Sequence, residues 1–242
     1  MLARKALAGT AAAPKVYVED VFSTYLYTGD GSTKTITNNI DLSTQGGMVW
    51  VKRRSGVYDH SVFDTVRGAQ LELNTNLDSL ATTRSTGITS FGTTGFTTGS
   101  FGGTNANGET YASWTFRKAK KFFDIVTYTG NGTAGRTISH NLGSVPGCIF
   151  IKRTNDSSGW AVYHRSLNVA NNESFQLNSS IASFTTEQYW NYTAPTSTEI
   201  TLGNNATVNG NGSSYVAYIF AHDAGGFGEA GDQSVIKCVV LS

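Results

Sequence analysis

The sequence GMVWVKR at residues 47–53 returns as GCIFIKR at residues 147–153, and this pair of stretches decides the fold. Each is a short apolar run that ends in two basic residues, as expected of a strand buried along most of its length. Two further pairs of stretches match in the same way: YTGDG at 27–31 with YTGNG at 128–132, and NG at 107–108 with NG at 211–212. The spacing is roughly 100 residues, which is long enough for each copy to hold its own core.

Composition favours β structure in both copies. The chain contains 27 glycines, 13 phenylalanines and 11 tyrosines, and only 14% of its residues are charged. Such a composition suits strands and tight turns better than long helices. We therefore predict an all-β protein made of two tandem, similar β-sandwich domains, over residues 21–120 and 121–233. A jelly-roll or other lectin-like sandwich is the first expectation, and an immunoglobulin-like sandwich is the second.

Two terminal segments flank the copies. Residues 1–20 begin with small apolar residues and two basic ones, and are predicted to form an N-terminal arm that docks on a partner. The sequence VIKCV at 235–239 resembles FFDIV at 122–126. Residues 234–242 are therefore predicted to form a strand that begins like a third copy. Such a strand needs a neighbour for its backbone groups, either the second domain or another subunit.

Charge, hydropathy and cysteine content exclude several classes of partner. The chain has 18 basic and 17 acidic residues, a net charge of +1, which creates no field to attract nucleic acid. No apolar run reaches the roughly 18 residues of a membrane span, so no membrane insertion is expected. Cys148 and Cys238 are too few for a disulfide framework, and each is predicted to pack as a small apolar side chain.

No group of residues has the spacing of a catalytic or metal site. The chain lacks the G-x-S-x-G turn of serine hydrolases and the phosphate-binding glycine loop. Asp59, Asp64 and Glu72 lie near one another in sequence, but the matching positions of the second copy are not acidic, so a glycosidase pair is not favoured. The adjacent His222 and Asp223 are predicted to form part of a turn. We expect no enzyme activity, no cofactor and no metal ion.

Aromatic residues supply one candidate contact surface. Tyr189, Trp190 and Tyr192 lie in a polar, loop-like stretch, and an exposed ring there could stack on a sugar. Trp50 and Trp160 could do the same, but their alternating strand positions favour the core.

Basic residues supply another candidate surface. Arg53 and Arg54 follow the apolar run of the first copy, where they could meet an anionic glycan or a partner subunit. The alternative is that these charges only prevent a sheet edge from pairing with other chains.

The repeated motifs resemble an uncharacterised tandem β-repeat domain in virion and tail-fibre proteins of marine tailed bacteriophages of the cyanophage type. The resemblance is carried by the YTG(D/N)G motif and by the glycine-led apolar strand that ends in Lys-Arg. It is strongest in NLGSVPGCIFIKR at 141–153 and YVAYIFAHDAGGFG at 215–228. It runs from about Val21 to Cys238, nearly the whole chain.

The resemblance implies a bacteriophage virion structural protein without catalytic residues. A peripheral tail fibre or spike that aids host attachment is the first expectation, with a capsid decoration protein or a carbohydrate-binding module as alternatives. Such a protein is assembled in the host cytoplasm and then lies on the surface of the extracellular particle. The expected partners are other virion proteins, met through the N-terminal arm; further copies of the chain, with a trimer favoured; and a host-surface glycan.

Overall fold

A computed structural model describes residues 15–185 and 188–239 of the 242-residue chain. Within them it contains sixteen strands, three short helices and one 3-10 turn. The elements of the first half are α1 (Val18–Val21), β1 (Phe22–Thr28), β2 (Lys34–Thr37), β3 (Gly47–Arg53), β4 (Ser61–Asp64), β5 (Gly68–Leu73), β6 (Thr82–Thr83), β7 (Ile88–Phe91), β8 (Gly95–Thr98), α2 (Gly102–Asn105) and β9 (Thr110–Arg117). Those of the second half are β10 (Phe123–Thr129), β11 (Arg136–Ser139), β12 (Pro146–Arg153), β13 (Trp160–His164), the turn η1 (Val169–Asn171), β14 (Phe175–Gln176), β15 (Glu199–Leu202), α3 (Ala206–Asn209) and β16 (Ser214–Ala221).

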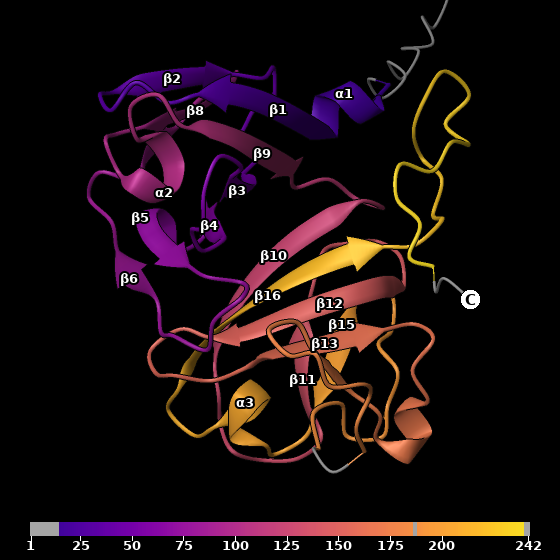
Figure 1. The fold of residues 1–242 in the computed structure, drawn as a ribbon. Helices are drawn as coiled ribbons and strands as arrows, with labels where there is room; N and C mark the ends of the chain where they lie inside the picture. The colour runs from indigo at the N-terminus through magenta and orange to yellow at the C-terminus, as the bar shows by residue number, and fades with distance from the viewer. Residues whose placement is uncertain (1–14, 186–187, 240–242) are drawn as a thin grey trace, which may run out of the picture.

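Each half contains a large and a small antiparallel sheet (Figure 1). The first half pairs the sheet β1-β9-β3-β4-β5-β6 with β2-β8-β7, and the second pairs β10-β16-β12-β13-β14 with β11-β15. Apolar side chains from both sheets of a half meet between them, such as Val49 with Ile36 in the first and Ile149 with Ile200 in the second. The predicted all-β class with two similar sandwiches is therefore confirmed.

Strand pairing follows the same register in the two halves, apart from a shift between Pro146 and Cys148 at the start of β12. The matching pairs of opposed residues are Met48–Phe116 with Cys148–Phe220, Trp50–Trp114 with Phe150–Tyr218, and Ile36–Phe96 with Ile138–Ile200. We call the two halves repeat 1 and repeat 2. The same register in two ladders shows that the copies in sequence are also copies in structure.

A third core joins the repeats. Side chains alternate along β3, so Val49 and Val51 enter the sandwich of repeat 1 while Met48 and Trp50 point to the opposite face. The corresponding outer face of repeat 2 carries Tyr218 of β16. The two large sheets pack on each other through these faces. The molecule is thus layered small sheet, large sheet, large sheet, small sheet, and each repeat covers part of the apolar face of the other.

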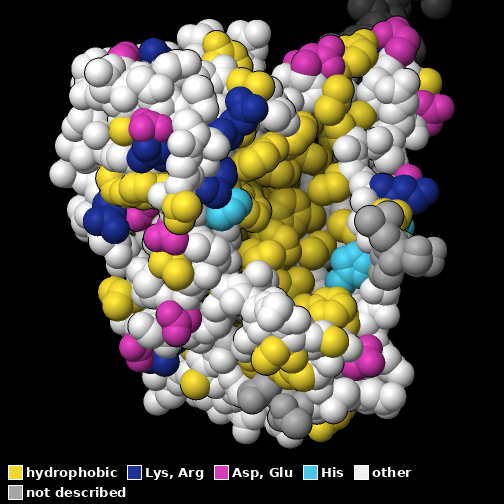
Figure 2. All heavy atoms as spheres, in the orientation of Figure 1, with side chains coloured by type: hydrophobic (Ala, Val, Ile, Leu, Met, Phe, Trp, Pro, Cys, Tyr) yellow, Lys and Arg dark blue, Asp and Glu magenta, His cyan; other side chains and the backbone are white. Residues whose placement is uncertain are grey.

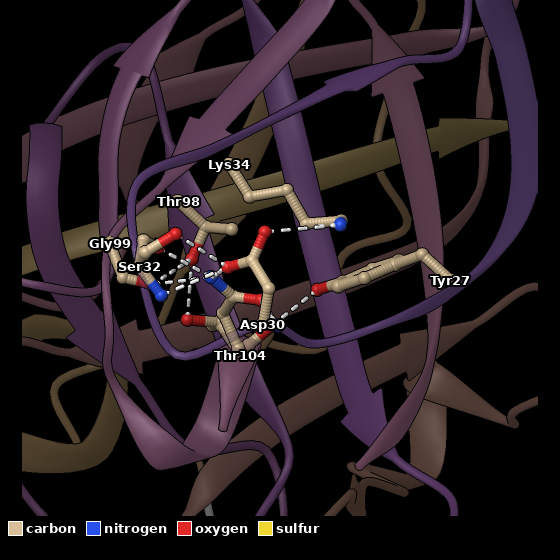
Figure 3. Close-up of polar contacts among 8 residues, drawn as sticks. Tyr27, Asp30, Ser32, Lys34, Thr98, Gly99 and Thr104 are labelled. Atoms are coloured by element: carbon tan, nitrogen blue, oxygen red, sulfur yellow. Dashed lines mark hydrogen bonds and ion pairs between the residues drawn. The ribbon is translucent and has the colours of Figure 1, made fainter. Parts of the chain in front are cut away.

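The YTGDG motif of repeat 1 forms a hydrogen-bonded turn (Figure 3). The buried Asn105 side chain donates hydrogen bonds to Asp30 Oδ1 at 3.1 Å, to the Ser32 carbonyl at 2.7 Å and to the Gly99 carbonyl at 2.9 Å. The Tyr27 hydroxyl donates to the carbonyl of Thr104 at 2.6 Å. These bonds satisfy polar groups at a tight, partly buried turn.

Repeat 2 builds the same turn. The Asn209 side chain donates to the carbonyls of Thr133 and Gly203 at 2.9 and 2.8 Å. The chain approaches itself so closely that a Cβ at Gly130 would lie 2.1 Å from the Gly210 carbonyl oxygen. This turn explains why the motif recurs: its residues are required by the fold.

The structure describes only part of the predicted N-terminal arm. Residues 1–14 of the predicted arm lie outside the described residues. From residue 15 onward the chain is held against the C-terminal segment: the Tyr17 hydroxyl donates to Glu229 Oε2 at 2.8 Å, and the Gly228 N–H donates to the Val16 carbonyl at 2.9 Å. In its described part, from residue 15 on, the predicted arm packs on the C-terminal segment of its own chain, and its docking on a partner stays a prediction.

The C-terminal strand predicted at residues 234–242 is not formed in its described part, 234–239. The Asp223 N–H donates to the Ile236 carbonyl at 2.9 Å, and the Cys238 N–H donates to His222 Nδ1 at 3.0 Å. The segment lies beside the end of β16 in the same chain. It cannot add to β16 as a strand, because β10 and β12 already occupy both edges of β16.

Candidate functional site

An apolar groove opens on the surface between the two repeats (Figure 2). It consists of two adjoining cavities of about 280 and 210 Å³, which share Trp50 and Phe116. We call it the inter-repeat groove. Its other lining residues are His60 and Trp114 of repeat 1, Cys148, Phe150 and Phe220 of repeat 2, and Ile236, Lys237 and Cys238 of the C-terminal segment.

Aromatic rings in mutual contact form the walls of the groove. Trp50 on β3 meets Trp114 on β9 edge to face, with ring centroids 6.2 Å apart. Phe116 of repeat 1 meets Phe220 of repeat 2 at 5.6 Å, and Phe220 meets Phe150 at 5.2 Å. The walls therefore come from both large sheets. The groove lies where the outer faces of the two large sheets are no longer in contact with each other.

The groove contains few polar atoms that a ligand could reach. The Trp50 indole N–H donates to His60 Nδ1 at 2.9 Å, so both groups already have a partner. Burial, and then the charge of Lys52, hold the pKa of His60 below its ordinary value, so the imidazole is neutral at pH 7. The Lys237 ammonium at the rim pairs with Asp223 at 3.3 Å. Such a surface can bind an apolar side chain, but it offers little to a hydroxylated or charged ligand.

A polar pocket of about 360 Å³ lies on repeat 1. Its aromatic walls are Tyr58 and Phe101, which meet edge to face at 5.8 Å. The Arg84 side chain lies 5.0 Å above the Phe101 ring and donates to the buried Glu72 at 2.7 Å. Asp59 accepts a hydrogen bond from Asn76 Nδ2 at 2.7 Å, also in the pocket lining. We call this the repeat 1 pocket.

A larger cavity, about 460 Å³, lies at the seam between the repeats. Its lining includes Thr127, Thr129 and Thr154, together with the rings of Tyr128 and Tyr215. The hydroxyls of these two tyrosines donate to the carbonyls of Val208 and Ala206 in helix α3 of repeat 2. The hydroxyls of both tyrosines in this lining are therefore already hydrogen-bonded within repeat 2.

The predicted aromatic contact surface at residues 189–192 is wrong for two of its three members. Trp190 is 0% exposed and Tyr189 is 1% exposed, and both belong to the core of repeat 2. Trp190 packs edge to face on Tyr163 at 5.6 Å. Tyr192 alone projects to solvent, with 54% of its surface exposed. The loop is polar in sequence, but its two large rings fill the end of the sandwich.

Of the two arginines in the predicted basic surface, one is paired and the other is exposed. Arg53 forms an ion pair with Glu109 of the same repeat, whereas Arg54 is exposed. Arg153, at the matching position of repeat 2, pairs with Asp156 at 3.1 Å. These arginines lie at the end of β3 or β12 and the aromatic group lies in the loop before β15, so the sequence-predicted residues do not form one site.

Of the three carboxylates that lie near one another in sequence, Asp59 and Glu72 share a pocket and Asp64 lies elsewhere. Asp64 is buried, and its Oδ2 accepts hydrogen bonds from Arg67 Nε at 2.5 Å and from the Tyr218 hydroxyl at 2.7 Å. Glu72 is buried and is bonded to Ser61 and Arg84. Asp59 is in the same pocket as Glu72, whereas Asp64 joins repeat 1 to repeat 2. In the described part of the chain, no group of His, Cys, Asp and Glu side chains could hold a metal ion.

Sequence reasoning missed the inter-repeat groove. The alternating strand position of Trp50 favoured the core, whereas Trp50 lines the groove. A signal was present: strand 110–117 carries Tyr111 on one face and Trp114 and Phe116 on the other, so both faces of this strand are apolar. Such a strand indicates that both faces of the large sheet bury apolar side chains, one against its own small sheet and the other against a further layer.

Comparison with known families gives one match. The model of the family DUF7483, a domain of unknown function, matches residues 18–234 and so spans both repeats. Searches of curated proteins and of solved structures found no match. Among the described residues, no helix has the length and apolar character needed to cross a membrane. Because the family model covers most of the sequence, including both sandwiches, the chain belongs to the DUF7483 family.

Proposed function

We propose that this protein is a structural component of a tailed-bacteriophage particle, a peripheral tail fibre or spike that aids attachment to the host without catalysis. The phage assignment rests on the resemblance of the repeated motifs. The inter-repeat groove carries the proposal that the protein works by assembly with another protein. A contiguous, solvent-open apolar surface on a folded protein is typical of a protein-binding site.

The chemistry of the groove favours an extended apolar segment of a neighbouring virion protein as its occupant. Trp50, Trp114 and Phe116 supply rings without free polar groups beside them. Aromatic side chains in a concave, desolvated patch are the usual centres of binding energy in protein interfaces. A sugar would leave its hydroxyls unpaired here, at a cost of about 1–3 kcal/mol for each buried group.

The test is to change the groove without changing the fold. Trp114→Arg places a charge in the groove, and Tyr192→Arg places one on an exposed surface elsewhere as the matched control. Phage propagated with Trp114→Arg should yield particles that lack the protein, while Tyr192→Arg particles retain it. Urea denaturation of the purified variants checks that both fold. Normal incorporation of folded Trp114→Arg would refute assembly through the groove.

Immunogold labelling of intact virions separates the two positions on the particle. Label on tail appendages supports the proposed role in attachment, whereas label over the head supports the alternative of a capsid decoration protein. Absence of the protein from purified particles would refute both.

The repeat 1 pocket supports carbohydrate binding as a second candidate function. Asp59 and Asn76 offer the carboxylate and amide groups that pair with sugar hydroxyls, next to the Tyr58 ring. A volume of about 360 Å³ lies at the lower end of the range for small-ligand sites. On a glycan array, Asp59→Ala should lose any signal that the unaltered protein gives, and Asp156→Ala, an exposed acid of repeat 2, should keep it. No signal from the unaltered protein would remove this candidate.

A further inference from the structure

We propose that Cys148 and Cys238 are partners in a disulfide bond that forms under oxidising conditions and ties the C-terminal segment to β12 beside the inter-repeat groove. They are the two cysteines of the 242-residue chain, 90 positions apart in sequence. Both line the same cavity of about 280 Å³. In the structure both are thiols.

The position of Cys148 is set by β12. Its side chain lies on the same face as that of Phe150, two residues along the strand, and both residues line the groove. The pairing of β12 with β16 shifts between Pro146 and Cys148, so Gly147 forms a bulge immediately before the cysteine. A bulge re-aims the neighbouring side chain and opens the strand locally.

Cys238 is held against this bulge. A Cβ at Gly147 would lie 2.9 Å from Cys238 Sγ and 3.1 Å from Cys238 Cβ, so only glycine leaves room for the cysteine. The Cys238 N–H is bonded to His222 Nδ1 at 3.0 Å, and its thiol lies 3.5 Å from the carbonyl oxygen of Ala221. Cys238 therefore packs on the residue immediately before Cys148, and both cysteine side chains line the same cavity, where Cys238 also contributes to the raised pKa of Cys148.

The chemistry requires an external oxidant, and a small-molecule disulfide such as oxidised glutathione supplies it. The Cys238 thiolate attacks this disulfide and forms a mixed disulfide, releasing one small thiol. The Cys148 thiolate then attacks the Cys238 sulfur and releases the second small thiol. Two protein S–H bonds and one small disulfide thus become one protein disulfide and two small thiols. Burial, and then the neighbouring Cys238, raise the pKa of Cys148 to about 12, so the second step is slow at neutral pH.

The bond would fix Ile236 in the groove. This side chain lies two residues before Cys238 and packs on both the core of repeat 2 and the core between the repeats. With Cys238 tied to β12, the segment could no longer leave the groove wall. If the protein is a virion component, as proposed above, the bond would form after the particle leaves the reducing host cytoplasm; the bond itself does not depend on that role.

Mass spectrometry of the purified full chain tests the bond. After incubation with oxidised glutathione, the protein should lose two hydrogen atoms in mass and both of its alkylatable thiols, and dithiothreitol should restore them. Cys148→Ser and Cys238→Ser should each keep one alkylatable or glutathionylated thiol. Cross-linked dimers or doubly glutathionylated monomers in place of an internal bond would overturn the proposal.

Trypsin tests the attachment of the segment. Cleavage after Lys237 frees the peptide that begins at Cys238. In the oxidised protein this peptide should stay bound to the fragment that contains Cys148 until a reductant is added. Release of the peptide without reductant, in protein that has lost both thiols, would show that the bond joins other partners and would refute the pairing.

Discussion

The outer faces of the two large sheets have the same strand register but not the same burial. In repeat 2, Trp160 is 0% exposed in the core between the repeats, and its indole N–H donates to the Asn74 carbonyl at 2.9 Å. The matching position of repeat 1 is His60, which lies half-buried in the wall of the open groove. At this matched position the outer face of repeat 2 is sealed, whereas that of repeat 1 is open to the groove.

The loops that follow β5 and β14 explain this difference. The loop at residues 74–81 of repeat 1 crosses to repeat 2, where the Asp78 carbonyl accepts hydrogen bonds from Lys152 Nζ and from the Ser158 N–H. Lys52, the counterpart of Lys152, instead donates to Tyr58 of its own repeat. The corresponding loop of repeat 2 turns back and places Trp190 in its own core. The large sheet of repeat 2 covers part of the outer face of repeat 1, and the rest of that face lines the groove.

The largest expected effect tests the sealed face. Trp160→Ala removes a large, fully buried side chain between the repeats and should lower the free energy of unfolding by about 3–5 kcal/mol. His60→Ala, the matched change on the open face, should cost about 1 kcal/mol, because less burial is lost. Urea denaturation measures both. Equal losses would mean that the two faces are equally covered in solution.

A smaller effect tests the polar link between the repeats. Asp64→Asn removes the charge that accepts from Arg67 and Tyr218, and should cost about 2–3 kcal/mol. His164→Asn at the matching position of repeat 2 should change stability by no more than about 0.5 kcal/mol, because this side chain bonds to the exposed Ser166. Thermal unfolding of the two variants gives the comparison, and a loss at His164 as large as that at Asp64 would contradict it.

Matched substitutions in the two turns should lower stability equally, unlike matched substitutions on the two outer faces. Asn105→Ala and Asn209→Ala each leave buried carbonyls without a donor, and each should cost about 2 kcal/mol. The two losses should agree within about 0.5 kcal/mol, since the two turns have the same geometry. A wide difference in denaturation midpoints would show that only one repeat depends on its turn.

The smallest effect is a dependence on pH. The pKa of His60 is below its ordinary value, mainly through burial, so the unfolded chain binds a proton near pH 6.5 that the folded chain does not yet bind. His60 therefore reduces stability as the pH falls below about 6.5 and has no such effect above it. His60→Gln should make the acid loss shallower by at most about 1.4 kcal/mol per pH unit. Denaturation at pH 7.5 and at pH 5.5 measures the change; an unaltered slope would contradict the burial of His60.

Much of the fold was accessible from the sequence because duplication is itself visible there. The matched stretches at 47–53 and 147–153 predicted two similar sandwiches, and the observed ladders align them as expected. Both stretches were also predicted to be strands buried along most of their length, and Val49 and Ile149 are buried in the two sandwiches.

The inter-repeat groove could not be predicted from the sequence in the same way. Alternation says that a face is apolar but not what covers it, so the position of Trp50 favoured the core although Trp50 lines the groove. The error for Trp190 has the opposite sign. Its polar neighbours in sequence predicted that it is exposed, whereas the loop places its side chain in the core. In both cases the path of a loop decides burial, and loop paths depend on contacts between residues that are distant in sequence.

The mutual covering of the two large sheets has a consequence during synthesis of the chain. When the ribosome has completed β9, the outer face with Met48, Trp50 and Phe116 is finished, but the sheet that covers it does not yet exist. About a hundred further residues must be added, which takes about 5–20 seconds at elongation rates of about 5–20 residues per second. Throughout that interval the nascent first sandwich presents an apolar sheet to solvent. The linkage of the two repeats in one polypeptide limits the exposure to this single interval, because the covering sheet arrives on the same chain at high local concentration.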